Sequence, residues 1–142
     1  MKWADGRLLT AVPVGPSDSL FAILNHIYRA EALWLRRVLG EPAAQLAHIE
    51  EAAGMEELRL RWPSANQGWI DWAARLTDDA AWSQMVPHRD SRGNSYQLPA
   101  WQIVMHVVNH GSYHRGQAIR LMREAGITPP ATDLVLYYRT LS

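Results

Sequence analysis

The chain has 142 residues, of which 48% are hydrophobic and 20% are charged, and its formal net charge is zero. This length predicts a single domain over residues 1–142 with a hydrophobic core, and the composition excludes a disordered chain. Zero net charge argues against a nucleic-acid binder, which needs a broad basic surface.

Two absences from the sequence limit the chemistry and the location that we expect. The chain has no cysteine, which excludes disulfides, thiolate metal ligands and a nucleophilic thiol of its own. No apolar run reaches the roughly 18 residues of a membrane span, and the first residues lack the apolar core of a signal peptide. We therefore expect a cytoplasmic protein with no membrane partner.

Apolar residues at helical spacing, interrupted by proline and glycine, predict four helices. The expected helices cover residues 1–12, 20–39, 55–76 and 99–125. Pro63 falls inside the third helix and should kink or split it, because proline removes a helical hydrogen bond. Since strands and helices do not alternate along the chain, this order predicts an all-α four-helix bundle.

The segments outside these helices give weaker signals. Residues 41–54 are ambiguous, and we expect a loop with a helical turn. Within residues 82–98, the turn signal of Arg92-Gly93-Asn94 predicts a small hairpin before the last helix. The tail, residues 128–139, is apolar enough to pack back on the bundle.

One carboxylate occupies a position where an apolar side chain is expected. Glu31 lies near the middle of the apolar face of the second helix, where burying a charge is costly. We therefore expect Glu31 to face a polar partner, either a backbone group or an arginine.

Three histidines of the last helix, His106, His110 and His114, follow one another at four-residue spacing. Each step of four residues advances only about 40° around a helix, so the three imidazoles rise along one side. His110 and His114 fall inside the apolar stripe of this helix, and His106 falls at its margin. Two imidazoles at this spacing can share one metal ion.

The roles of the other histidines allow several interpretations. His26, at the edge of the second helix's apolar face, is a candidate third ligand, and three imidazoles leave one coordination position open, as in catalytic sites. His106 could be a fourth ligand, a hydrogen-bond partner of a ligand or a proton carrier. The alternative is that these histidines bind no metal and only form hydrogen bonds in the core. His48 and His88 lie in loop-like segments and are expected at the surface.

The stretch from His106 to Gln117, His-Val-Val-Asn-His-Gly-Ser-Tyr-His-Arg-Gly-Gln, resembles the DinB-like (damage-inducible) family. The family pattern is close to Asn-His-x-x-His-His-Arg-Gly-Gln. Supporting stretches begin at Trp3, Leu24 and Pro129, so the resemblance covers nearly the whole chain. Relatives of this family include the bacillithiol transferases and the mycothiol-dependent maleylpyruvate isomerases.

The resemblance implies an up-down-down-up bundle that holds a divalent ion, often nickel or zinc, on three histidines. Carried over by position, the metal ligands are His26, His110 and His114. His106 is then either a further ligand or a neighbour that supports the ligands. Gln117 could orient a ligand or the substrate.

Two departures from the family pattern bear on the pocket. Tyr113 stands where the family usually has a histidine, and helical geometry turns it away from the apolar stripe. The first helix is short, so we expect a pocket that is more open or is completed by a partner subunit, as in a homodimer. Arg115, which lies between the last ligand and Gln117, could anchor the tail through Asp133.

These observations predict a divalent-metal-binding protein, and we favour a metal-dependent enzyme of thiol-transferase or hydrolase type acting on a small-molecule substrate. The expected cofactors are zinc or nickel and a low-molecular-weight thiol. The alternative is a non-catalytic metal-binding stress-response protein. The family name refers to DNA damage, but neutral charge and the lack of a basic helix predict no nucleic-acid partner.

Overall fold

The computed structural model of the chain describes residues 1–42, 49–90 and 92–142. Its elements in chain order are α1 (Lys2–Ala11), α2 (Asp18–Val38), α3 (Met55–Ala73), α4 (Asp79–Trp82), β1 (Met85–Arg89), β2 (Ser95–Pro99), α5 (Ala100–Glu124) and α6 (Leu134–Tyr138). The long helices confirm the all-α prediction. Within the described ranges, no helix is long and apolar enough to cross a membrane.

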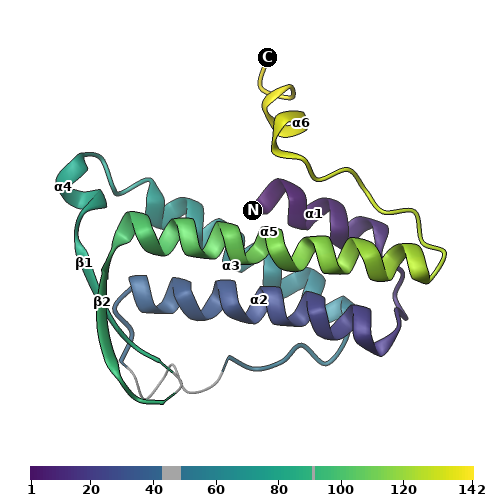
Figure 1. The fold of residues 1–142 in the computed structure, drawn as a ribbon, viewed down its shortest axis with the longest axis horizontal. Coiled ribbons are helices and arrows are strands. Elements are labelled where there is room, and N and C mark those ends of the chain that lie inside the picture. Colours follow the sequence, from purple (N-terminus) through teal and green to yellow (C-terminus); the bar gives the residue numbers. More distant parts are fainter. Residues whose placement is uncertain (43–48, 91) are drawn as a thin grey trace.

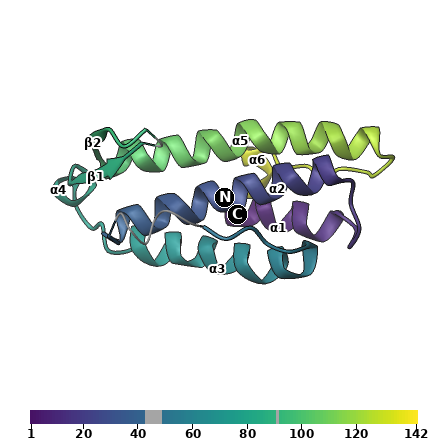
Figure 2. The same cartoon turned by 90° about the horizontal axis from the view of Figure 1, so that it is seen from below.

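The four helices α1, α2, α3 and α5 lie side by side as a bundle (Figures 1 and 2). α1 and α5 run in one direction and α2 and α3 in the other, which is the up-down-down-up order. Residues 49–54 run along the bundle to the beginning of α3, in the direction opposite to α2 (Figure 1). α2 makes the most extensive contacts, first with α5 and then with α3, so it is the central helix of the fold.

Local signals set the helix ends. At the start of α2, Ser17 Oγ accepts a hydrogen bond from the backbone N–H of Leu20 (3.4 Å), as expected for a helix cap. α2 ends before Gly40, whose φ is +76°, and α5 ends before Gly126, whose φ is +73°. Glycine adopts these left-handed conformations without steric cost.

Of the two effects expected of Pro63, a kink or a split, the split does not occur, because α3 runs through Pro63 without a break. Proline inside a helix costs about 3 kcal/mol. Leu58 and Trp62, on the preceding turn and a half, are fully buried, and each such burial contributes about 1.5–3 kcal/mol. Packing of this helix against the core therefore offsets the lost hydrogen bond.

The predicted hairpin is confirmed. β1 and β2 pair in antiparallel register, with Met85 opposite Pro99 and Arg89 opposite Ser95. The hairpin lies at the end of the bundle where α2 ends and α5 begins (Figure 1). The short helix α4 that precedes it is not among the predicted elements.

The prediction that the tail packs back on the bundle is wrong for most of its length. α6 projects away from the other helices (Figure 1). More than half of the surface is exposed at Leu134, Val135, Tyr138 and Leu141. The tail is tethered to α1 by the aromatic contact of Tyr137 with Trp3 (5.9 Å between centroids) and by Arg7 Nε, which donates to the Ala131 carbonyl (2.9 Å). Apolar character alone does not determine which surface a segment covers.

Two groups of buried side chains form the core. The group at the end of the bundle where α2 begins includes Leu8, Leu24, Ile27, Leu58, Trp62 and Met122. The group nearer the hairpin includes Leu35, Trp69, Trp72, Val86 and Ile103. Along α2, α3 and α5, the buried polar residues Glu31, Asn66 and Arg115 fall between the two groups. The core is therefore interrupted by a polar layer.

Hydrogen bonds join the polar layer across the helices. Trp62 Nε1 donates to Glu31 Oε2 (2.7 Å), so the polar partner of Glu31 is an indole and not the expected backbone group or arginine. Arg115 Nη1 donates to Asp5 Oδ1 (3.0 Å), and Asn66 Nδ2 donates to Asp5 Oδ2 (3.2 Å). Arg115 thus anchors α1 rather than the tail, and the expectation of a pair with Asp133 is wrong.

The polar layer holds two carboxyl groups and one guanidinium. The pKa of Glu31 is raised to about 8, mainly by burial and in part by the nearby charge of Asp5. Burial also raises the pKa of Asp5, while the charge of Arg115 opposes that rise. Since Asp5 is the carboxylate that pairs with Arg115, we assign the negative charge to Asp5 and a proton to Glu31 at neutral pH.

This assignment predicts a stability that falls as the pH rises. Glu31 keeps its proton in the folded protein up to a pKa of about 8, whereas its ordinary pKa is 4.5. Between these two pH values the unfolded chain loses the proton first, so the free energy of unfolding should fall by up to about 1.4 kcal/mol per pH unit from this group. Glu31→Gln should remove that slope and keep the hydrogen bond to Trp62.

Urea unfolding of the wild type and Glu31→Gln between pH 5.5 and 8.5 measures the slope directly. Glu57→Gln is the control, because Glu57 is ion-paired with Arg61 at the surface and its pKa is lowered. Equal slopes in the wild type and Glu31→Gln would contradict the assignment of the proton to Glu31.

Candidate metal centre

The structure brings three histidines from two helices together. His26 on α2 lies beside His110 and His114 on α5, although 84 and 88 residues separate them in the sequence. His26 Nε2 lies 3.2 Å from His110 Nε2 and 3.2 Å from His114 Nε2. One ring nitrogen from each histidine lies within 4.8 Å of the other two. The residues implied by the family resemblance therefore form one cluster.

These separations fit the donor set of a metal ion. Nitrogen ligands at about 2.0–2.1 Å from a tetrahedral ion are about 3.3–3.4 Å apart. The two measured separations of 3.2 Å are close to that value. Within the described residues, no carboxylate joins the three histidines in this cluster. Three imidazoles therefore leave one position of a tetrahedral ion for water or substrate.

The side chain of Gln117 orients one of the three imidazoles. His114 Nδ1 lies 2.7 Å from Gln117 Oε1. Because the amide oxygen can only accept, Nδ1 carries the proton and Nε2 keeps its lone pair. That lone pair faces the cluster, as metal binding requires. Gln117 thus has the ligand-orienting position suggested by the sequence.

The other two imidazoles are also poised as neutral ligands. Burial, followed by the charges of the neighbouring histidines, lowers the pKa of His110 to about 4. Burial also lowers the pKa of His26, followed by the charges of His114 and Arg29. Neutral imidazole is the form that binds a metal ion.

His106 lies next to this cluster and not in it. Its ring is 5.9 Å from the His110 ring, and it meets the Trp34 ring at 5.2 Å between centroids. Burial lowers the pKa of His106, and the charges of Arg37 and His88 lower it further. His106 therefore borders the site but is not one of the three clustered histidines.

Three further residues were considered from the sequence: His88, His48 and Tyr113. His88 is not a free surface residue, because it is half-buried and its ring contacts Trp34 at 5.0 Å. His48 lies outside the described residues. Tyr113 is 65% exposed, as its position on the helix predicts, and its ring edge contacts His114 at 5.0 Å.

Sequence reasoning did not identify Trp34 or Arg37 as part of this region. Arg37 follows His26 by eleven residues, which is three helical turns, so both lie on the same side of α2. That spacing is a usable signal for Arg37. No comparable signal marks Trp34, which is one of seven tryptophans in the chain.

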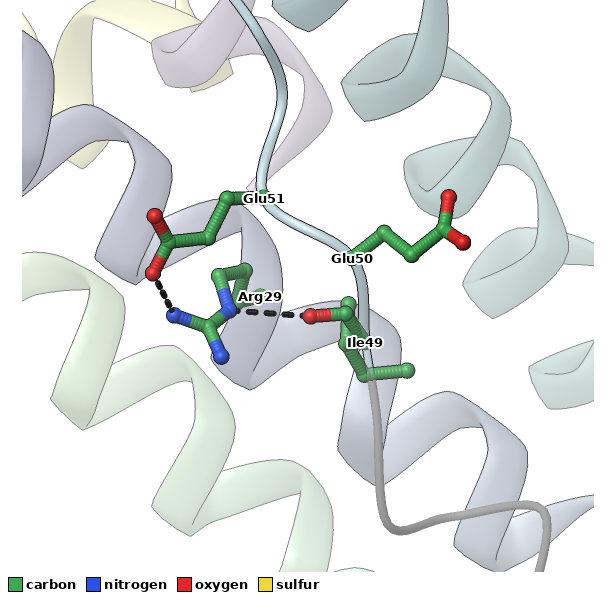
Figure 3. Close-up of a pocket in the computed structure, with 4 residues that line it drawn as sticks. All are labelled: Arg29, Ile49, Glu50 and Glu51. Atoms are coloured by element: carbon green, nitrogen blue, oxygen red, sulfur yellow. Dashed lines mark hydrogen bonds and ion pairs between the residues drawn. The ribbon is translucent and has the colours of Figure 1, made fainter.

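A pocket of about 500 Å³ lies one turn beyond His26 on α2 and is lined by Arg29, Ile49, Glu50 and Glu51 (Figure 3). Arg29 Nε donates to the Ile49 carbonyl (3.1 Å), and its guanidinium forms an ion pair with Glu51. Glu50 points away from Arg29 (Figure 3). The cation in this pocket is therefore already neutralised by the protein itself.

Comparisons with known proteins agree with the fold and with the family resemblance of the sequence. The model of the DinB family matches residues 9–140. The chain is 25% identical to "Protein DinB" of Bacillus subtilis (strain 168) over 126 residues, which are 84% of this chain and 72% of that protein. A crystal structure of a DinB-like protein from Bacillus cereus ATCC 10987 matches with a TM-score of 0.70 and 18% identity, over 93% of this chain and 90% of that one. At that identity, the structural match supports the fold alone.

The contact with Gln117 predicts how metal affinity depends on it. Gln117→Ala should weaken zinc binding by about 10- to 100-fold, because the His114 ring loses the acceptor that fixes it. Gln117→Glu keeps an oxygen acceptor and should retain most of the affinity. Competition with a chromophoric chelator measures both, and Gln97→Ala, an exposed amide on β2, is the control. Unchanged zinc affinity in Gln117→Ala would contradict the role of Gln117 in orienting the His114 ring.

Proposed function

The chain belongs to the DinB family, and we propose that it is a metal-dependent enzyme of thiol-transferase or hydrolase type. The observation that carries this proposal is the convergence of one ring nitrogen from each of three imidazoles, with two separations of 3.2 Å. An open fourth position is the layout of catalytic rather than structural zinc sites. Zinc and nickel are the ions that we expect.

The residues of this chain have distinct parts in the proposal. His26, His110 and His114 would hold the ion, and Gln117 keeps the His114 ring in its ligand tautomer. A bound ion of this kind lowers the pKa of a coordinated thiol or water toward neutrality. His106, whose ring nitrogens make no hydrogen bond with the described residues, is placed to accept the proton that is released.

The thiol in this proposal comes from solution. The chain has no cysteine, so it offers no thiolate nucleophile of its own. A low-molecular-weight thiol or a water molecule at the ion would supply the nucleophile, and a small electrophile would be the second substrate. A homodimer and a cytoplasmic location stay predictions.

A non-catalytic metal-binding role is the second candidate, and one observation favours it. The three histidines join α2 to α5, the two helices with the most extensive mutual contact in the described bundle. An ion bound there would stabilise the folded state by mass action, whether or not it takes part in chemistry. Such a protein would gain thermal stability from metal without turning over a substrate.

Metal content tests the site itself. Elemental mass spectrometry of untagged protein should find about one ion per chain, and His26→Ala and the double variant His110→Ala/His114→Ala should each lose it. His106→Ala is the matched control and should keep the ion. Loss in the double variant but not in His26→Ala would show that His106 replaces His26. No ion after incubation with zinc or nickel would exclude the metal centre.

A screen of thiol transfer and hydrolysis separates the two candidate functions. Metal-loaded protein should transfer a small thiol to an electrophile or hydrolyse a small substrate, and His110→Ala should reduce the rate to background. Chelation should abolish the activity, and added metal should restore it. A metal-dependent rise in melting temperature without any turnover would favour the non-catalytic role.

A further inference from the structure

Aromatic and basic side chains gather at the hairpin end of the bundle, beside the three histidines. Trp34 of α2 is at the centre of this group. The rings of His106 from α5 and His88 from β1 meet it at interplanar angles of 65° and 62°, with 5.2 Å and 5.0 Å between centroids. The Arg37 guanidinium carbon lies 4.4 Å from the Trp34 ring centroid. We call these four residues the Trp34 cluster.

The Trp34 cluster adjoins the candidate metal centre. His106 precedes His110 by one turn of α5, and the two rings are 5.9 Å apart. On α2, Trp34 follows His26 by eight residues, which is about 12 Å along the helix axis. A ligand held at the three histidines would therefore have to extend about this far along α2, toward the hairpin, to reach Trp34.

The Trp34 cluster has positive charge that no described carboxylate neutralises. Arg37 Nη2 donates to the Arg89 carbonyl (2.7 Å), Nε is buried without a partner, and Nη1 makes no hydrogen bond within the described residues. The neighbouring arginines differ, because Arg29 pairs with Glu51 and Arg36 pairs with Glu41.

A purely structural role explains only part of this arrangement. The stacking of Arg37 on Trp34 and its bond to Arg89 would hold the hairpin against α2. That role does not explain why Arg37 is a cation that lacks an anionic partner, since a neutral donor could make the same bond to the Arg89 carbonyl. A buried donor left without a partner destabilises the folded state. A guanidinium in this state is suited to a carboxylate that arrives with a ligand.

We propose that the Trp34 cluster recognises the carboxylate end of a ligand whose other end is bound at the three-histidine centre. Arg37 contacts the carboxylate, and Trp34 and His106 line the apolar part of the ligand between the two ends. The ligand class is a small thiol or thiol-derived substrate with a carboxylate several carbons from the sulfur. This inference rests on the proposed function, because it needs an ion that holds the sulfur.

Cobalt-loaded protein provides a binding test that does not depend on activity. Cobalt replaces zinc in such sites, and a thiolate bound to it gives a charge-transfer absorption band. The probes are 8-mercaptooctanoate, 8-mercaptooctanol and 8-aminooctanethiol, which differ only in the terminal group. The carboxylate probe should bind about tenfold more tightly than the hydroxyl probe, because a hydrogen bond to a charged group is worth about 1.5–3 kcal/mol. The amine probe should bind most weakly.

Variants assign the preference to Arg37. Arg37→Gln should equalise the carboxylate and hydroxyl probes and leave the affinity of the hydroxyl probe unchanged. Arg37→Lys keeps the charge and should keep part of the preference, so a folding defect in one variant does not decide the outcome. Arg36→Gln is the matched control, because the adjacent Arg36 pairs with Glu41 (2.5 Å), and it should keep the full preference.

The possible failures are distinguishable. Equal affinities of the three probes in the wild type would overturn the inference and leave the metal centre intact. A preference that survives Arg37→Gln would overturn the assignment to the Trp34 cluster. Absence of cobalt binding, or of a thiolate band with every probe, would overturn the proposed function and this inference with it.

Discussion

The distance between α2 and α5 depends on a single glycine beneath the histidines. A Cβ atom at Gly111 would lie 2.8 Å from Arg115 Nη1 and 3.2 Å from Glu31 Oε1. Both neighbours are buried and held by hydrogen bonds, so neither can easily move aside. The absence of a side chain at position 111 therefore lets α5 approach α2 closely enough for His110 to reach His26.

The same turn of α5 faces two environments. Gly111 and Arg115 directly follow His110 and His114, and each step along a helix rotates by about 100°. Arg115 therefore points into the core and pairs with Asp5, while His114 points toward His26. A buried ion pair is weak evidence for stability, but it allows few alternative rotations of the helix. We interpret the polar layer as the element that fixes the rotation of α5.

Charge is distributed unevenly on the two sides of the histidines. On one side, Arg29 is neutralised by Glu51 within the pocket of Figure 3. On the other side, Arg37 stacks on Trp34 and has no carboxylate partner among the described residues. A ligand with a negative group would therefore be attracted toward the hairpin, and not toward the pocket beside Arg29.

Local sequence determined the helices and the four-residue spacing of His110 and His114, because these depend on neighbours within a few turns. Only the tertiary structure placed His26 beside that pair, matched Arg115 with Asp5 and left the tail exposed. Periodicity gives the face on which a residue lies, and the family resemblance selects His26. Neither gives the rotation and register of one helix against another, since these result from packing across the whole core.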